Sequence, residues 1–446
     1  MRPPRNPLPP LRALLLAALA ALAGWGSAAT AQAGAPSDLD ALQLADRTPA
    51  PAAAPARDWQ GHVEAAAGQA RRATWAGGGT LGTQRLSLAL QLDTALAPGW
   101  RFVAANRLDL DWPAQPGKEK HALHTLQEAY ASGQIDAAQT LDLGRVRAHF
   151  GVATGYNPTD VFRGGSLRSQ ASADPNSLKR NRQGAVMLRS RHLSEAGALT
   201  WLVSPRLSAD SQPSDAPFSL DTGASNARHR ALLAWSPNLG GAWTERLNVQ
   251  TLLLAQEGQA PQAGLNLSAL LGEATTAFAE WTGGHSRSQL AQALGTPQET
   301  HFHPRLSSGF TWTSSRRLSV TLEIAHNRAA PTATAWQALQ TGAGLGSPLA
   351  YTLYRQWVSN AQELTTRRLW AVYASWPDAW AQHLDLSAML RVNPDDHSRL
   401  HWLELRQHGE RFDVALQWQH TSGTPLSDLG AAARSGVWQL SLRRWF

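Results

Sequence analysis

Residues 411–419 read RFDVALQWQ, a stretch in which apolar and polar side chains alternate one by one. Phe412, Val414 and Leu416 share one face of an extended chain, because successive side chains of a strand point to opposite sides. Asp413 falls on the other face, together with polar Arg and Gln side chains. The stretch therefore predicts a β-strand with one apolar and one polar surface.

The same alternation recurs from Trp59 to the end of the chain, and no helical period of comparable length interrupts it. We expect eighteen strands, with sixteen as the next choice, because single-chain bacterial barrels have even strand numbers. The expected strands cover residues 59–69, 83–93, 100–112, 122–132, 138–147, 183–193, 196–206, 227–236, 242–254, 263–271, 273–283, 303–313, 316–327, 363–376, 381–392, 397–407, 409–420 and 435–446. The pattern predicts an all-β fold, a transmembrane antiparallel barrel with a polar lumen.

A soluble β-sandwich is the main alternative, since its strands also alternate. The polar faces carry many Arg, Asp and Gln side chains, which a dry core does not tolerate. Charged residues make up only 16% of the chain, and many of its 19 Trp lie toward strand ends, where a membrane barrel has its aromatic girdles. Lipid is therefore the expected outer solvent.

The chain begins with the signals of an exported protein. Residues 13–23 (ALLLAALAALA) form an apolar run too short to span a bilayer; three Arg precede it, and A-x-A sites end at Ala31 and Ala33. This order predicts a cleaved signal peptide over residues 1–33. Residues 34–57, rich in Ala and Pro and without alternation, are expected to be a periplasmic linker, which leaves 58–446 for the barrel.

The chain ends SGVWQLSLRRWF, and steps of two back from Phe446 place Leu442, Leu440 and Trp438 on its face. This pattern resembles the terminal strand of Gram-negative outer-membrane β-barrels, and the chain as a whole resembles a porin-like barrel. The resemblance implies a place in the outer membrane, with outer-membrane lipid and the barrel-assembly machinery as partners. Because only residues 34–57 precede the first expected strand, we expect neither the plug domain of an energy-coupled receptor nor the passenger of an autotransporter. Arg444 departs from the pattern, although a long side chain near the interface can snorkel.

Positive charge is concentrated in one segment. Residues 144–191 hold nine Lys and Arg against two acids, a local net charge of +7. The full chain has the same net charge, +7, and three of its Arg lie in the signal peptide, so the rest of the mature chain is net negative. We expect these cations to set the preference of a pore for anionic solutes, as rings of Arg and Lys do in anion channels. They are Arg145, Arg147, Arg163, Arg168, Lys179, Arg180, Arg182, Arg189 and Arg191. A solvated loop that contacts lipid phosphates is the alternative.

Two local features shape this segment. Leu141 and Leu143 would share a face with Arg145, so a bulge near Gly144 is expected to keep the arginine away from lipid. Asn157, Pro158 and Asp160 favour a turn, because Pro fixes φ and the polar side chains bond nearby amides. A long, Gly-bearing loop can then fold into the lumen as a constriction.

The sequence therefore predicts an outer-membrane channel for the passive passage of small polar, anionic solutes. An export port for a secreted polymer and a surface-display barrel, with binding loops in 206–227, 284–302 and 328–362, are the alternatives. The chain lacks Cys and has no nucleic-acid motif or catalytic spacing, so neither an enzyme nor a nucleic-acid partner is expected, and no cofactor. The His301-x-His303 pair alone does not predict a metal site. The oligomeric state stays open.

Overall fold

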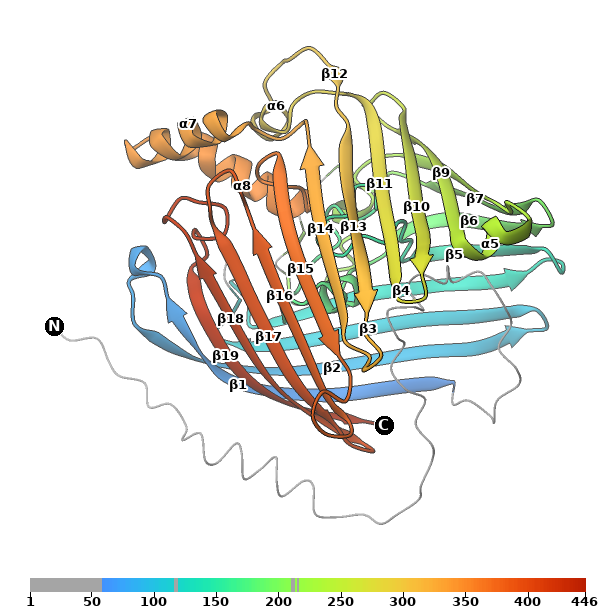
Figure 1. The fold of residues 1–446 in the computed structure, drawn as a ribbon, viewed down its shortest axis with the longest axis horizontal. Helices are drawn as coiled ribbons and strands as arrows, with labels where there is room; N and C mark the ends of the chain where they lie inside the picture. The colour runs from blue at the N-terminus through green and yellow to red at the C-terminus, as the bar shows by residue number, and fades with distance from the viewer. Residues whose placement is uncertain (1–57, 116–118, 210–212, 215) are drawn as a thin grey trace. The chain divides into compact units, whose positions relative to one another are not determined.

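The structure is a computed structural model that describes residues 58–115, 119–209, 213–214 and 216–446. The expected signal peptide, 1–33, and linker, 34–57, lie outside these residues. One antiparallel sheet dominates the described part (Figure 1). Its strands are β1 (Trp59–Arg72), β2 (Thr80–Ala97), β3 (Trp100–Trp112), β4 (Ala122–Gln134), β5 (Gln139–Val146), β6 (Ala185–Ser194), β7 (Gly197–Ser204), β8 (Arg230–Pro237), β9 (Leu247–Gln256), β10 (Gln262–Gly272), β11 (Thr275–Ser286), β12 (His301–Phe302), β13 (Arg305–Thr313), β14 (Ser319–Asn327), β15 (Arg368–Trp376), β16 (Leu384–Val392), β17 (Arg399–His408), β18 (Phe412–Ser422) and β19 (Arg434–Trp445).

The sheet closes on itself because β1 pairs with both β2 and β19. β12 is a two-residue piece that pairs only with β11, and β11 also pairs with β13. The other strands form a closed ring of eighteen. The prediction of a transmembrane antiparallel barrel, and of eighteen strands, is confirmed.

Alternation divides each strand between lumen and lipid. On β2, Ser87 is buried while Leu88 is exposed, and on β14, Glu323 is buried while Ile324 is exposed. Charged groups on the inner face pair across strands; Arg85 of β2, for example, pairs with Glu64 of β1. The inner face is therefore polar and the outer face apolar, which is the arrangement that a bilayer requires.

The two ends of the barrel differ in their connections. Both the start of β1 and the end of β19 lie at the end where short turns join the strands, whereas the connections after β5, β7, β11 and β14 at the other end are long. Membrane barrels of this kind have short periplasmic turns and long extracellular loops. The end with the long connections is thus the extracellular one.

The structure places helices where the sequence analysis expected strand or loop. They are η1 (Thr74–Ala76), α3 (Pro175–Arg180), α4 (Thr222–Ser225), α5 (Gly241–Arg246), α6 (Gln289–Leu294), α7 (Ala333–Gly344) and α8 (Leu349–Ala361). β9 starts at Leu247, because α5 occupies the first residues of the strand expected over 242–254. Among the described residues, no helix is both long enough and apolar enough to cross a membrane.

α6, α7 and α8 cover part of the extracellular end (Figure 1). Thr332 caps α7 by accepting a hydrogen bond from the Ala335 amide at 3.2 Å. Trp336 and Tyr354 are fully buried between the helices, and the Trp336 indole donates to Asp396 at 2.8 Å. Aromatic burial, rather than helix propensity alone, thus holds these helices over the mouth.

Candidate functional site

The connection between β5 and β6, residues 147–184, folds into the lumen. Its backbone meets inward-facing side chains on distant strands: Arg85 of β2 donates to the Ala171 carbonyl at 2.8 Å, and Ala173 packs with Met389 of β16 and Trp402 of β17. Further contacts reach β11 and β14. The segment therefore crosses the channel, and we call it the lumen segment.

Two buried carboxylates on the barrel wall hold the lumen segment. Glu323 accepts hydrogen bonds from the amides of Thr154, Gly155 and Tyr156 at 2.9, 2.8 and 2.7 Å. Glu280 accepts from the amides of Val152 and Ala153 and from the Thr159 hydroxyl. Charged acceptors form stronger hydrogen bonds than neutral ones, so these two residues are the main anchors of the segment.

The turn of the lumen segment lies next to these anchors. The Asn157 carboxamide oxygen accepts from the Asp160 amide at 2.9 Å, and its NH2 group donates to the Phe150 carbonyl at 2.8 Å. The Asp160 carboxylate contacts the His149 ring at 2.9 Å and also pairs with Arg182. Burial alone would raise the pKa of Asp160, but His149 and Arg182 hold that pKa below its ordinary value.

A cavity of about 240 Å³ opens between the lumen segment and the ends of β5 and β6. Four of the nine predicted cations line it, together with His149 and a single acid, Asp160. They are Arg147, Lys179, Arg180 and Arg182. Its floor includes Val146 and Phe162, which belong to an apolar cluster. We call this space the basic cavity, and its excess of cations over acids favours an anionic occupant.

The cations of the basic cavity differ in how far their charge is already compensated. Arg147 pairs with Glu128 at 2.9 Å, and Arg182 pairs with Asp160. Lys179 donates to the Ala153 carbonyl at 3.0 Å, and burial lowers the pKa of its ammonium group. Arg180 has a side chain 70% exposed and 3.9 Å from Asp174. Arg180 is therefore the cation of this set best placed to meet a solute.

Arg145 and Arg168 are buried outside the basic cavity. Arg145 donates to the carbonyls of Gly184 and Leu220, and Arg168 donates to four carbonyls, those of His124, Ser214, Ala216 and Ser219. Arg168 also pairs with Asp221 at 2.9 Å. Both arginines thus bind the β7–β8 connection to the wall and the lumen segment.

The bulge expected near Gly144 is not present. Pairing of β5 with β4 and with β6 continues without a register shift through Arg145. Gly144 instead has a φ of 133°, and β5 ends two residues later. Arg145 stays away from lipid because the Leu220 and Gly184 backbones cover it, which sequence alternation alone does not reveal.

The remaining predicted cations also have acidic partners. Arg163 is buried, pairs with Glu363 and stacks over the Tyr156 ring at 4.9 Å. Arg189 and Arg191 lie on β6 at 2.8 and 3.8 Å from Asp142. The structure therefore divides the predicted set of nine into four that line the basic cavity and five that lie outside it.

Sequence reasoning missed the anchors. Glu280 and Glu323 lie at inward positions of their strands, but nothing in the sequence marks either as an acceptor for a loop more than a hundred residues earlier. The available signal was an acid at an inward position of a strand, flanked by apolar residues such as Phe278 and Trp281. Many inward acids share that signal, so it does not single these two out.

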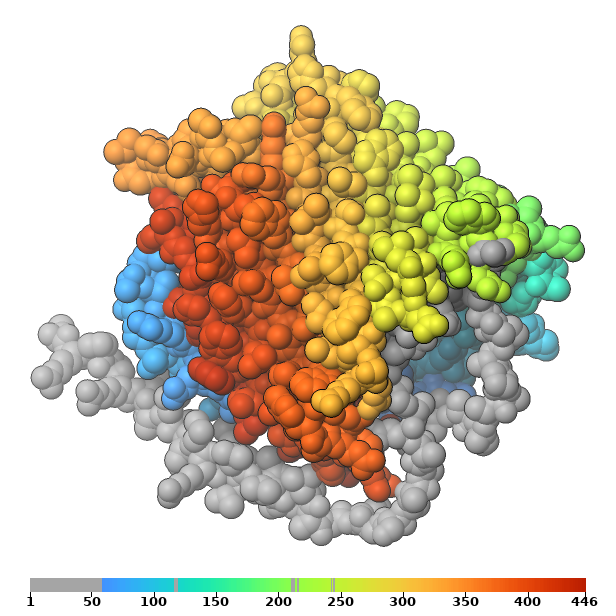
Figure 2. All heavy atoms as spheres, viewed as in Figure 1, coloured from blue at the N-terminus to red at the C-terminus, as the bar shows by residue number. Residues whose placement is uncertain are grey.

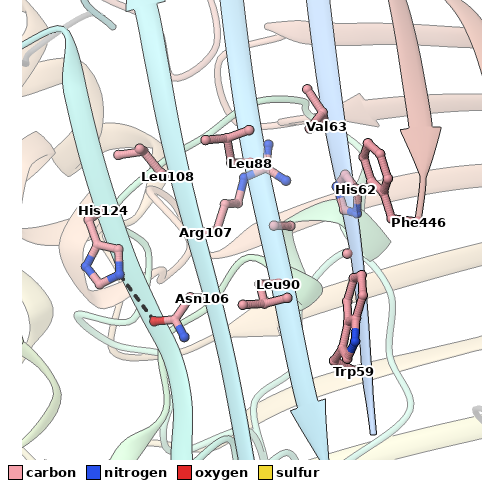
Figure 3. Close-up of a pocket in the computed structure, with 12 residues that line it drawn as sticks. Trp59, His62, Val63, Leu88, Leu90, Asn106, Arg107, Leu108, His124 and Phe446 are labelled. Carbon is pink, nitrogen blue, oxygen red and sulfur yellow. Dashed lines mark hydrogen bonds between the residues drawn. The ribbon is translucent and has the colours of Figure 1, made fainter. Parts of the chain in front are cut away.

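A second hollow, of about 290 Å³, lies on the outer wall across β1 to β4 (Figure 3). Trp59, Leu90 and Phe446 line it, and Asn106 and His124 form a hydrogen bond of 3.2 Å at its edge. Since these side chains are on the lipid-facing surface, the hollow is not part of the solute path.

The C-terminal strand has the predicted alternation. Trp438, Leu440 and Phe446 are exposed on the outer face, Leu442 has the same orientation, and Ser441 between them is buried. Arg444 points outward with them, and its guanidinium lies 5.5 Å from the Phe412 ring centre and 5.0 Å from that of Phe446. Cation–π contacts thus accommodate the one residue that departs from the pattern.

A closed ring of eighteen strands with an apolar outer face and a connection folded across its lumen defines the class: the chain has the fold of an outer-membrane porin. No protein-family model matches the chain, and no curated protein matches its sequence.

Among solved structures, OccK5 (OpdH) of Pseudomonas aeruginosa is similar with a TM-score of 0.52 and 9% identity, covering 87% of this chain and 98% of that one. The outer-membrane protein opdK of Pseudomonas aeruginosa gives a TM-score of 0.48 at 10% identity, with coverages of 87% and 99%. OccAB1 of Acinetobacter baumannii gives 0.49 at 9% identity, with coverages of 87% and 97%. The similarity to OccK5 confirms the predicted porin-like fold.

Proposed function

We propose that the chain is an outer-membrane channel for small polar, anionic solutes, with the lumen segment as its constriction and the basic cavity as a contact site. The observation that carries this proposal is the meeting of Arg147, Lys179, Arg180 and Arg182 around one cavity of a segment that crosses the lumen. Fixed positive charge at a narrow point raises the local concentration of anions and lowers that of cations.

The anchors support the same proposal. A constriction must keep its cations in place while ions pass, and Glu280 and Glu323 together accept six hydrogen bonds from the lumen segment. The lumen segment holds six Lys and Arg against two acids, an excess of four cations that exceeds the charge of the two anchoring carboxylates. The anchored segment therefore keeps its net positive character.

The test is the ion selectivity of the purified protein in planar bilayers, read from the reversal potential in a salt gradient. Arg180→Glu changes the charge of the most exposed cavity cation by two units and should lower anion preference severalfold. Arg246→Glu, an equal change in the exposed residue at the end of α5 on the periplasmic side, is the matched control.

The expected result is a clear shift for Arg180→Glu and little or none for Arg246→Glu, since charges beyond about 8–10 Å are screened at these salt concentrations. Equal shifts in both variants would contradict the role of the cavity. Electrical silence of the folded wild-type protein would contradict the channel itself.

A further inference from the structure

A second cluster of basic side chains lies on the outer wall, away from the lumen. Strand alternation places four residues outward at the extracellular ends of β17, β18 and β1, because their neighbours Leu400, Thr421 and Ala70 are buried. The four are Arg71, Arg399, His401 and His420. We call them the outer basic patch; Figure 2 shows the outer face of β14 to β19 (orange to red), with the β1–β2 hairpin (blue) beside it.

The sheet register brings the members of the patch together. His401 pairs with His420 across β17 and β18, and their ring centres are 6.4 Å apart. His420 pairs with Gly436 of β19, which in turn pairs with Arg71 of β1. A Cβ atom at Gly436 would lie 3.8 Å from both the His420 ring nitrogen Nδ1 and the Arg71 Cβ atom. The glycine thus leaves a hollow one side chain wide between two basic groups.

An apolar band begins directly below the patch. Trp418 stacks on His420 with ring centres 6.2 Å apart, and it also contacts Trp438 at 6.0 Å. Leu416 and Leu440 lie two residues further along their strands, and both are exposed. The patch is therefore at the level where lipid head groups meet acyl chains, with a Trp pair marking the boundary.

The charge of the patch is not neutralised by the protein. Of the ion pairs that the described residues form, none includes Arg71 or Arg399, and both side chains are exposed. Arg368, on the same rim, shows the contrast because it pairs with Asp395. Two uncompensated guanidinium groups at the head-group level are therefore available to an anionic group of the membrane.

We propose that the outer basic patch binds the phosphate group of a phosphorylated glycolipid in the outer leaflet. Arg71 and Arg399 supply the planar donors that match phosphate oxygens, His420 and His401 add ring N–H groups, and the hollow at Gly436 gives the phosphate room. The acyl chains lie along Trp418, Trp438 and Leu440. This site is independent of the lumen and holds whether or not the barrel conducts ions.

The test uses the full-length protein in detergent, with lipid A in its bisphosphorylated, monophosphorylated and dephosphorylated forms as probes. The fraction of protein that retains lipid is measured by native mass spectrometry. We expect retention to follow the number of phosphates. Loss of both arginines in Arg71→Gln/Arg399→Gln should weaken binding of the bisphosphorylated form at least about tenfold, because each lost charged hydrogen bond is worth a tenfold change or more.

Two further variants distinguish a specific phosphate site from nonspecific lipid binding and from misfolding. Gly436→Leu keeps every charge but fills the hollow, and it should weaken binding as well. Arg444→Gln removes an outward arginine at the periplasmic end and should leave binding unchanged. Heat-modifiable mobility in gels verifies that each variant is a folded barrel.

Three outcomes would overturn the proposal. The first is equal retention of the dephosphorylated lipid, which would assign the binding to the apolar band alone. The second is wild-type binding by both the double arginine variant and Gly436→Leu. The third is a lipid-free dimer of the wild type that the double variant disrupts, which would make the patch an interface between two copies of the chain.

Discussion

Glu323→Ala should release the lumen segment while leaving the barrel intact. The carboxylate accepts three backbone amides of the segment, at 2.7 to 2.9 Å, and also the Ser307 hydroxyl at 3.0 Å. A buried amide that loses its acceptor costs about 1–3 kcal/mol, so the three together cost about 3–9 kcal/mol if no water enters. Water in the lumen replaces part of these bonds, which makes about 3 kcal/mol the expectation.

A loss of about 3 kcal/mol raises the population of the displaced segment by about two orders of magnitude. Two assays report this change independently. Limited trypsin digestion should cleave the variant after Lys179 and Arg180, because displacement of the lumen segment makes these peptide bonds accessible. Single-channel recordings should show larger and noisier currents. Far-ultraviolet circular dichroism and heat-modifiable mobility should stay those of a folded barrel.

Glu404→Ala is the matched control, because Glu404 also faces inward but bonds Arg406 and Gln417 of the wall and not the lumen segment. Glu404→Ala should give the same tryptic cleavage pattern as the wild-type protein. If Glu323→Ala were cleaved no faster than Glu404→Ala, the anchoring role would be refuted, and this conclusion would not depend on whether the barrel conducts.

Two further predictions concern pH and barrel closure. The folded pKa of Asp160 is depressed, so its contribution to the stability of the lumen segment is fully present above about pH 4 and is lost only as pH falls through the lower folded value. Hydrogen exchange of the lumen segment, corrected for intrinsic rates, should therefore be alike at pH 8 and pH 5. In Asp160→Asn it should be faster at both pH values. Gly68→Ala should reduce the yield of folded barrel severalfold, because its Cβ atom would lie 2.0 Å from the Trp438 carbonyl oxygen across the pairing of β1 with β19. Gly82→Ala has open space around its Cβ atom and should fold normally. Equal yields of the two variants would contradict this explanation.

The strands could be predicted because their cause is local. A barrel wall needs one face for lipid and one for water, so period-two alternation fixes each strand within a few residues. All eighteen expected strands have a counterpart, from β1 (Trp59–Arg72) to β19 (Arg434–Trp445). The errors fall where no lipid face is needed: α5 replaces the start of one expected strand, and α7 and α8 replace an expected loop.

The helices could not be predicted because their stability comes from tertiary burial. Trp336 and Tyr354 have no exposed surface. The Trp336 indole bonds Asp396 and the Tyr354 hydroxyl bonds Gln289, 60 and 65 residues away, and the hydroxyl also donates to the Thr365 carbonyl beyond the end of α8. Neither helix-capping residues nor the hydrophobic periodicity of the sequence reveals such contacts. The same limit explains why the bulge at Gly144 was wrong, since Leu220 covers Arg145 from another loop.

The candidate site was predictable as a region but not residue by residue. Composition shows that cations gather in 144–191, yet it does not show which acceptors each one meets. Arg168 is surrounded by four carbonyls, and Arg163 by Glu363 and two backbone oxygens. Apart from the Asn157 carbonyl, which is six residues from Arg163, these acceptors are 44 to 200 residues away along the chain, so only the folded structure reveals them.

The number of acceptors around each guanidinium separates three uses of arginine in this barrel. Arg168, with several carbonyls and an acid, holds the wall together, and its charge is not available to a solute. Arg182, with one acid at the turn, positions the basic cavity. Arg180 inside the lumen and Arg399 outside it have little or no compensation from the described residues. Because an uncompensated charge attracts the nearest anion, we propose that Arg180 acts on the solute and Arg399 on the membrane.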